Sequence, residues 1–233
     1  MAGVSGALVV AHRLERGARD LSPKRHDAYL RTWGRAFLRA FGVGLTSDPE
    51  PDRSPLPRLV VSNHRSMIDI PILHAVFGGH LLSKADVADW PLVGAFAREA
   101  GTLLVDRDDA ASRAAAVLRI RERLRAGHTV CVFPEGTTFY GDEVRPFQAG
   151  AFAAVAREKG EVVPVGIAYE NEDAIFGDET MRAHLVRLLR IRTVRVAAAV
   201  GAPLPCAGLG VTRLRDRAQA EVQDLVHAAR GRL

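Results

Sequence analysis

Long hydrophobic runs are missing from this 233-residue sequence. No apolar segment approaches the roughly 18–20 residues that a membrane-spanning helix needs. The apolar stretch 4–11 is short and has no basic region before it, which is unlike a signal peptide. We therefore expect a chain that neither crosses a membrane nor carries a secretion signal.

Cysteines are scarce, and no metal-ligand pattern is present. Cys131 and Cys206 lie far apart, so we expect two reduced thiols in a cytoplasmic protein. The acidic run 106–109 is interrupted by Arg107 and has no partner cluster nearby, so we expect no metal site there. The sequence also lacks an internal repeat and the G-x-S-x-G motif of serine nucleophiles.

A nucleic-acid reader motif is absent as well. The net charge is +5, but the arginines are spread over several predicted helices, which disfavours nucleic-acid binding. A moderate positive charge suits an anionic membrane surface or an anionic substrate. The hydrophobic fraction of 48% and the charged fraction of 25% are those of an ordinary globular domain.

Short apolar runs alternate with segments of helical character along the chain. This order predicts a single α/β domain with a mixed, largely parallel sheet flanked by helices. We expect an N-terminal segment (1–45), a proline-rich linker (46–57) and the main domain (58–233). The expected strands are 59–61, 81–83, 102–105, 129–133, 162–168 and 194–200, and the expected helices are 23–41, 70–77, 91–100, 110–126, 150–159, 181–190 and 211–229.

The helix expected at 23–41 is amphipathic. Ser22 is a suitable N-cap, and Pro23 fits the first helical position. The apolar residues recur every three or four positions and arginines surround them; the apolar set is Leu30, Trp33, Phe37 and Phe41. Such a helix can lie in a membrane interface, or it can pack its apolar stripe on the protein core.

The most informative stretch is 60–69, where a buried strand ends in a polar cluster. His64 and, five residues later, Asp69 follow that strand. A neutral imidazole can take a proton near neutral pH, and a carboxylate on its second nitrogen would orient it and stabilise the imidazolium. Because no nucleophile motif is present, the pair would activate a substrate hydroxyl. The alternative is structural: Ser66 and Asp69 have capping-box spacing, and Pro71 fits a first helical turn.

Two further strands end in polar residues. Arg107 follows the strand at 102–105, where a guanidinium can bind phosphate or carboxylate; the alternative is an ordinary surface arginine. The strand at 129–133 runs into Pro134-Glu135-Gly136-Thr137-Thr138. Glycine lets a ligand approach the backbone closely, although such a tripeptide is also a common turn.

Together these segments resemble the PlsC-like glycerolipid acyltransferases, which include the 1-acylglycerol-3-phosphate acyltransferases. His64 and Asp69 match the H-x4-D motif of that family. Segments 101–107, 133–137 and 162–166 resemble its second, third and fourth motifs in the same order, so the resemblance covers about residues 57–205. It implies the acyltransferase fold for residues 58–233.

The resemblance also implies a mechanism. His64 would remove a proton from the acceptor hydroxyl, Asp69 would orient His64, and the hydroxyl oxygen would attack an acyl-CoA or acyl-carrier-protein thioester directly. No cofactor beyond this co-substrate is expected. The implied substrate-binding residues are Asn63, Arg107, Glu135, Gly136, Thr137, Thr138 and Arg145. We expect a cytoplasmic protein on the inner face of the cell membrane.

The sequence departs from the family pattern where phosphate-binding cations are common. Thr138-Phe139 stands where many relatives have Arg-Ser, and Gln148 stands where they have lysine. Arg145 can replace one of these cations. We expect 1-acylglycerol 3-phosphate as acceptor. The alternatives are lyso-ornithine lipid, because its acyltransferases resemble this chain in having Thr-Thr after the glycine, and a non-catalytic lipid-binding role on the membrane surface.

Overall fold

The computed structural model describes residues 22–89, 94, 97–98 and 100–233. Within these residues an eight-stranded sheet has the order β1-β7-β6-β2-β5-β3-β4, with β8 beside β6. The strands are β1 (Val43–Ser47), β2 (Arg58–Ser62), β3 (His80–Lys84), β4 (Leu103–Val105), β5 (Val130–Val132), β6 (Glu161–Tyr169), β7 (Val194–Val200) and β8 (Leu204–Pro205). Strands β2 to β6 run parallel, whereas β1, β7 and β8 run the opposite way. The predicted α/β class with a mixed, largely parallel sheet is confirmed.

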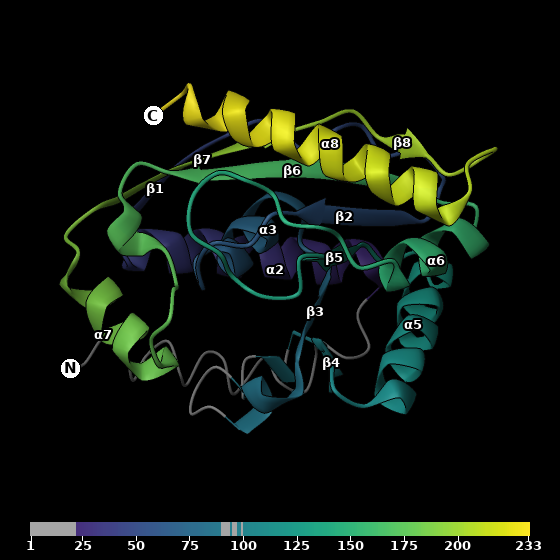
Figure 1. Ribbon diagram of the computed structural model, residues 1–233, viewed down its shortest axis with the longest axis horizontal. Helices are drawn as coiled ribbons and strands as arrows, with labels where there is room; N and C mark the ends of the chain where they lie inside the picture. The colour runs from purple at the N-terminus through teal and green to yellow at the C-terminus, as the bar shows by residue number, and fades with distance from the viewer. Residues whose placement is uncertain (1–21, 90–93, 95–96, 99) are drawn as a thin grey trace.

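Helices cover both faces of the sheet (Figure 1). Helices α2 (Pro23–Ala40), α3 (Asp69–Phe77) and α7 (Met181–Arg190) contribute to one core cluster. Helices α5 (Ala110–Arg125), α6 (Gly150–Arg157) and α8 (Val211–Arg230) contribute to the cluster on the other face. Two short 3-10 helices, η2 (Ala85–Asp89) and η3 (Glu172–Ala174), complete the described elements.

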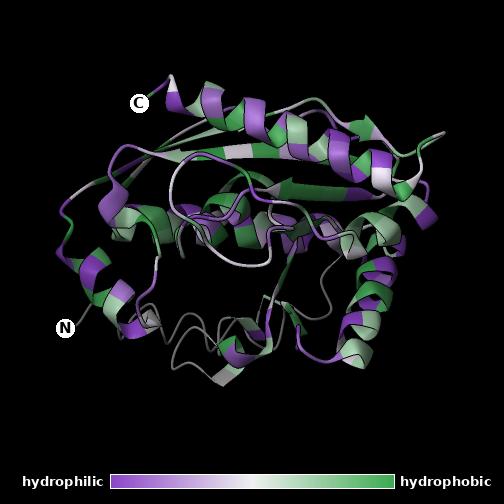
Figure 2. Ribbon diagram, in the orientation of Figure 1, coloured by the Kyte–Doolittle hydropathy of each residue, from purple (hydrophilic) through white to green (hydrophobic). Residues whose placement is uncertain are grey.

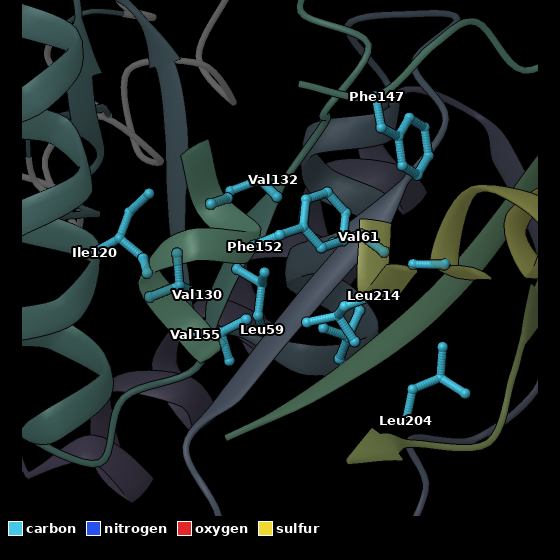
Figure 3. Close-up of a cluster of buried hydrophobic side chains, with 14 of the residues drawn as sticks. Leu59, Val61, Ile120, Val130, Val132, Phe147, Phe152, Val155, Leu204 and Leu214 are labelled. Atoms are coloured by element: carbon cyan, nitrogen blue, oxygen red, sulfur yellow. The ribbon is translucent and has the colours of Figure 1, made fainter. Parts of the chain in front are cut away.

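Strand β2 lies between the two core clusters and is buried along its whole length. Side chains alternate across a strand, so Leu59 and Val61 face the α5, α6 and α8 side while Val60 faces α2 and α3. Figure 3 shows Leu59 and Val61 among Phe152, Leu214 and their neighbours. Burial on both faces explains why the three central residues of this strand are all apolar, and β2 is mostly green in Figure 2.

Most predicted elements are confirmed within two residues of their expected ends. Helix α7 and strand β7 have the predicted bounds. The start of α5 is set by Asp109, whose carboxylate accepts hydrogen bonds from the amides of Ala111 (3.0 Å) and Ser112 (3.1 Å). Most of the helix predicted at 91–100 lies outside the described residues. The sequence analysis missed the edge strand β1 and the two-residue strand β8.

The segment before residue 58 belongs to the same structural unit. Residues 43–47, assigned to the N-terminal segment and the linker, form β1 and pair with β7, which corrects the predicted boundary at residue 46. Helix α2 packs on α3 at Gly34, where a Cβ atom would lie 2.6 Å from the amide nitrogen of Ala75. Residues 1–21 lie outside the described residues.

The apolar stripe of α2 is only partly buried. Leu30 is fully buried, Trp33 and Phe37 are half-buried, and Phe41 is 36% exposed. The buried face of α2 is therefore rotated from the predicted stripe. It keeps Leu30 and adds Gly34 and Leu38. None of the described helices is both long and apolar enough to cross a membrane.

Candidate active site

The polar clusters predicted from the sequence lie at one edge of the sheet. Strands β2, β4 and β5 are parallel, so the residues that follow them lie at the same carboxyl edge. Strand β5 is next to β2, which brings Glu135 close to His64. Strand β4 is three positions from β2, so Arg107 lies roughly 14 Å further along this edge.

His64 and Asp69 form the pair that the sequence predicts. Nδ1 of His64 donates to Oδ2 of Asp69 at 2.8 Å. This bond places the proton on Nδ1 and leaves Nε2 as the basic nitrogen of the neutral ring. The His64 side chain is 15% exposed and that of Asp69 is fully buried. The imidazole can therefore meet a substrate while its carboxylate partner is shielded from water.

Asp69 also orders the loop before α3. Its Oδ2 atom accepts the backbone amides of Arg65 at 2.6 Å and Ser66 at 2.8 Å. The amide of Ile68 donates to the Ser66 hydroxyl at 3.3 Å. Helix α3 begins at Asp69, with Ile68 as its N-cap and without a side-chain cap bond, so the predicted capping box is not formed. Asp69 instead orders the turn before the helix and binds the imidazole with the same carboxylate.

Tyr169 and Phe133 complete the surroundings of this pair, and the sequence analysis assigned a role to neither. The Tyr169 hydroxyl donates to Oδ1 of Asp69 at 2.5 Å. Burial, followed by the charge of Asp69, raises the pKa of Tyr169 well above its usual value, so the phenol stays protonated as a donor. The Phe133 ring stacks on His64 with centroids 4.0 Å apart. The imidazole is therefore fixed by a hydrogen bond and by an aromatic face.

Glu135 is engaged by protein donors rather than open to solvent. Its Oε2 accepts the His64 amide at 2.6 Å, and its Oε1 accepts the Arg145 amide at 2.8 Å. Arg65 pairs with both oxygens, at 3.1 and 2.9 Å, and both side chains of this ion pair are buried. Arg65 also donates to the carbonyls of Gly141 and Glu143. In this structure Glu135 positions the loops around His64, and its head-group contact stays a prediction.

Asn63 is likewise held by the fold. Its side-chain amide donates to the carbonyl of Ile167 and its oxygen accepts the Ile167 amide, both at 2.8 Å. Asn63 is fully buried and continues the contact between β2 and β6 beyond Ser62. This geometry gives it a positioning role, and a substrate contact stays a prediction.

The segment after β5 offers exposed groups next to His64. Gly136 has a φ of 86°, a conformation that favours glycine, while Thr137 is exposed and Thr138 half-buried. The Phe139 amide donates to the His64 carbonyl at 3.2 Å. The Arg145 guanidinium lies 5.5 Å from the centre of the Phe139 ring. Phe139 therefore holds an exposed cation beside the loop of His64.

Arg107 is half-buried after β4. Its backbone carbonyl accepts a bond from Arg113 at 2.6 Å. Among the described residues, no hydrogen-bond partner of its guanidinium was found. Burial lowers the pKa of Arg107, and nearby Asp86 opposes this effect. A partly desolvated guanidinium of this kind can bind an anionic group of a ligand.

His184 of α7 supports the loop from the other side. Its Nε2 lies 3.4 Å from the Ser66 hydroxyl and its Nδ1 lies 3.0 Å from Oε1 of Glu179. Burial lowers the pKa of His184, and the hydrogen bond that it donates to Glu179 opposes this effect. The sequence carried no signal for this residue. For Tyr169 a signal existed, since it continues the alternation of Val163, Val165 and Ile167 toward the α3 face.

Comparisons with known proteins agree with this geometry. A family model described as Acyltransferase matches residues 48–168. A lyso-ornithine lipid O-acyltransferase of Pseudomonas aeruginosa is 37% identical over 211 residues, which cover 88% of this chain and 80% of that protein. A 1-acyl-sn-glycerol-3-phosphate acyltransferase of Neisseria gonorrhoeae is 28% identical over 157 residues, or 67% of this chain and 62% of that protein.

A solved structure has the same fold. The 1-acyl-sn-glycerophosphate acyltransferase PlsC of Thermotoga maritima matches with a TM-score of 0.72 over 97% of this chain and 90% of that one, at 18% identity. The family model covers half of the chain, and the Pseudomonas relative exceeds 30% identity over most of it. The chain therefore belongs to the acyltransferase family, in its PlsC-like glycerolipid branch, and is an O-acyltransferase.

Proposed function

We propose that this protein transfers a fatty acyl group from a thioester donor to the free hydroxyl of a lysolipid, with His64 as general base. The observation that carries the proposal is the 2.8 Å bond from Nδ1 of His64 to Asp69. It leaves Nε2 to accept the hydroxyl proton, and the buried carboxylate stabilises the imidazolium that forms.

The reaction needs no covalent acyl-enzyme. The acceptor oxygen attacks the thioester carbonyl carbon as its proton passes to Nε2 of His64. The carbon–sulfur bond then breaks, and the imidazolium returns the proton to the departing thiolate. The hydroxyl of Tyr169 and the amides of Arg65 and Ser66 hold Asp69 in place throughout. The donor, acyl-CoA or acyl-carrier protein, is part of the proposal.

We favour lyso-ornithine lipid as the acceptor, which reverses the preference drawn from the sequence alone. Two observations support this choice. The Pseudomonas relative of that name is 37% identical over 88% of the chain. Thr138 and Gln148 stand where many relatives carry cations for a phosphate. An amino-acid head group is zwitterionic and needs fewer cations.

1-Acylglycerol 3-phosphate is the second candidate acceptor. The Neisseria relative carries that activity in its name. The guanidinium of Arg145, which is exposed beside the His64 loop and 3.5 Å from the Glu143 carboxylate, and that of Arg107 are two cations at this edge of the sheet that can meet a phosphate. The two acceptors share the chemistry at His64 and differ in the head group to be bound.

A parallel transfer assay tests both the acyl-transfer reaction with His64 as base and the identity of the acceptor. Purified protein is incubated in detergent with radiolabelled palmitoyl-CoA, or palmitoyl-carrier protein, and with each lysolipid separately. We expect labelled ornithine lipid, and no product with His64→Ala. Labelled phosphatidate alone would establish the second acceptor. Undiminished transfer by His64→Ala, or no transfer from either donor to either lipid, would overturn the proposal.

The Arg107→Ala variant distinguishes the acceptors further. With a zwitterionic head group we expect kcat/KM to fall only a few-fold, because one carboxylate contact is weakened. With lysophosphatidate the loss is roughly 100-fold, since a phosphate loses a charge-assisted pair. The matched control is Arg119→Ala, because Arg119 is an exposed arginine of α5. A hundredfold loss with lyso-ornithine lipid would contradict this assignment.

We further propose that the protein works on the cytoplasmic surface of the membrane. The half-buried Trp33 and Phe37 and the exposed Phe41 lie on α2 with the exposed cations Arg35 and Arg39. Aromatic and basic side chains together suit an anionic lipid interface. Sedimentation with anionic vesicles tests this idea. The Arg35→Glu/Arg39→Glu variant should lose most of its binding, and unchanged binding would refute the role of α2.

A further inference from the structure

Three histidines from distant segments meet at the opposite, amino-terminal edge of the parallel strands. His26 lies in the first turns of α2, His80 is the first residue of β3, and His128 lies between α5 and β5. The rings of His26 and His80 stack with centroids 4.2 Å apart, and His128 lies edge-on to both. One nitrogen from each ring lies within 4.8 Å of the other two.

Each ring has a buried nitrogen without a hydrogen-bond partner among the described residues. These atoms are Nδ1 of His26, Nε2 of His80 and Nδ1 of His128. His26 and His80 are each 3% exposed. A buried polar atom without a hydrogen-bond partner is costly. Three such nitrogens in one place indicate a binding site for an ion or a small polar ligand.

The protonation state of His80 suits a ligand. Its Nδ1 donates to the Gly101 carbonyl at 2.9 Å, so the lone pair is on the buried Nε2. A backbone carbonyl on the second nitrogen is the usual support of a metal-bound histidine. Burial lowers the pKa of His80 to about 3 and also lowers that of His128. Both imidazoles are therefore neutral at physiological pH, as metal ligands must be.

We propose that His26, His80 and His128 bind one divalent transition-metal ion of the Zn²⁺ type. Imidazole nitrogens suit zinc, and three histidines with an open fourth position are a known zinc arrangement. Zinc–nitrogen bonds of about 2.0–2.1 Å place ligand nitrogens roughly 3.4 Å apart, so the nitrogens must approach by little more than an ångström. The stacked rings of His26 and His80 must also rotate so that their in-plane lone pairs point at one ion. Asp27 supplies a nearby negative charge, with Oδ1 3.7 Å from Nδ1 of His26.

The ion would have a structural function. The three ligands join α2 to β3 and to the turn before β5, whereas His64 follows the carboxyl end of β2. His128 is half-buried and lines a cavity of about 200 Å³. Arg53 and Arg58 also line this cavity, but each is paired with a carboxylate, Asp27 and Glu161 respectively. The site therefore fastens α2 to the sheet.

Metal binding is tested on the full-length protein after removal of metals with a chelator. We expect one zinc ion per chain by elemental analysis after gel filtration, and a melting temperature several degrees higher with zinc than without. Cobalt(II) should give the visible absorption of a tetrahedral nitrogen site. None of these measurements depends on acyl transfer, so the outcome is separate from that of the proposed function.

Single variants identify the ligands. His80→Gln and His128→Gln should lose the zinc-dependent rise in melting temperature and the cobalt spectrum. His227→Gln should keep both, because His227 lies on α8 and bonds Gln223. Because His128 is only half-buried, its variant should fold even if that of His80 does not. The proposal fails if the wild-type protein binds no zinc or cobalt, or if His128→Gln retains wild-type binding.

Discussion

The carboxylate of Asp69 accepts hydrogen bonds from His64, from two backbone amides and from the hydroxyl of Tyr169. The sequence offered two interpretations of Asp69, as the partner of His64 or as part of a capping box with Ser66. In the structure Asp69 accepts the imidazole N–H and the amides of the preceding turn, while Ile68 is the N-cap of α3. The same residue therefore links the stability of this loop to the orientation of His64.

Asp69→Asn should affect both stability and acyl transfer, whereas His64→Ala should affect acyl transfer alone. The asparagine amide cannot accept from all of these donors, so we expect a loss of about 1–3 kcal/mol in the free energy of unfolding. We also expect kcat to fall roughly 10²–10⁴-fold, because the imidazole loses its orienting partner. His64→Ala should abolish transfer with an unfolding free energy near that of the wild type. Equal stability of Asp69→Asn and the wild type in urea denaturation would refute the structural role.

A structural role of Glu135 and a contact with the acceptor head group predict different effects of mutation. Glu135→Gln leaves the buried Arg65 guanidinium without its charge partner. Breaking a buried ion pair on one side costs about 3 kcal/mol or more, so we expect a clear drop in unfolding free energy together with lost activity. If Glu135 only bound the acceptor, KM would rise while the denaturation midpoint stayed unchanged. Glu143→Gln, at an exposed carboxylate, is the matched control.

Among the elements, the contact of α2 with α3 decides how the N-terminal segment joins the sheet. The sequence suggested that the stripe of Leu30, Trp33, Phe37 and Phe41 either packs on the core or faces a membrane. In the structure the close contact with α3 runs through Gly34, and the stripe is buried only at Leu30. Aromatic residues on the flank of this contact are left partly exposed.

Gly34→Ala tests the close approach of the two helices. A Cβ atom would lie 2.6 Å from the Ala75 nitrogen and 2.7 Å from the Pro71 carbonyl. Alanine gains about 1 kcal/mol in helix propensity, but forcing backbone segments apart costs about 1–3 kcal/mol. We expect a net loss of stability in urea denaturation. Gly44→Ala, whose Cβ would meet only the Val194 carbonyl at 3.9 Å, should be close to neutral. Equal stability of the two variants would contradict this view of the interface.

The whole molecule should lose stability in mild acid because histidines are buried in neutral form. Burial lowers the pKa of His74 from 6.5 to about 4. The unfolded chain therefore takes up this proton near pH 6.5, whereas the folded protein resists it until about pH 4. The stabilisation is present in full above pH 6.5 and decreases as the pH falls from 6.5 to 4, by up to about 1.4 kcal/mol per pH unit.

Urea denaturation at several pH values between 7 and 4.5 measures this dependence. The His74→Gln variant should show a shallower decrease than the wild type, because glutamine binds no proton. His227→Gln on α8 serves as the control and should keep the wild-type slope. Identical slopes for His74→Gln and the wild type would show that His74 does not contribute.

Local sequence patterns were sufficient for the elements and for the order of the motifs. The bounds of β7 and α7 were predictable because they depend on neighbouring residues only. The H-x4-D pair was predictable for the same reason, since His64 and Asp69 lie within one short loop. Strand β1 was missed, although the burial of its five residues alternates along the sheet edge.

The tertiary structure decided which distant residues meet. Tyr169 reaches Asp69, Glu135 reaches Arg65, and Asn63 pairs with Ile167 only because β6 and β5 flank β2 in the sheet. The meeting of His26, His80 and His128 likewise requires α2 to pack near the amino ends of β3 and β5. The sequence by itself determined most local elements and the pairing of His64 with Asp69, because these depend on short-range periodicity and spacing. The order of the strands in the sheet is set by burial over the whole chain. Contacts between residues on neighbouring strands depend on that order, so only the tertiary structure revealed them.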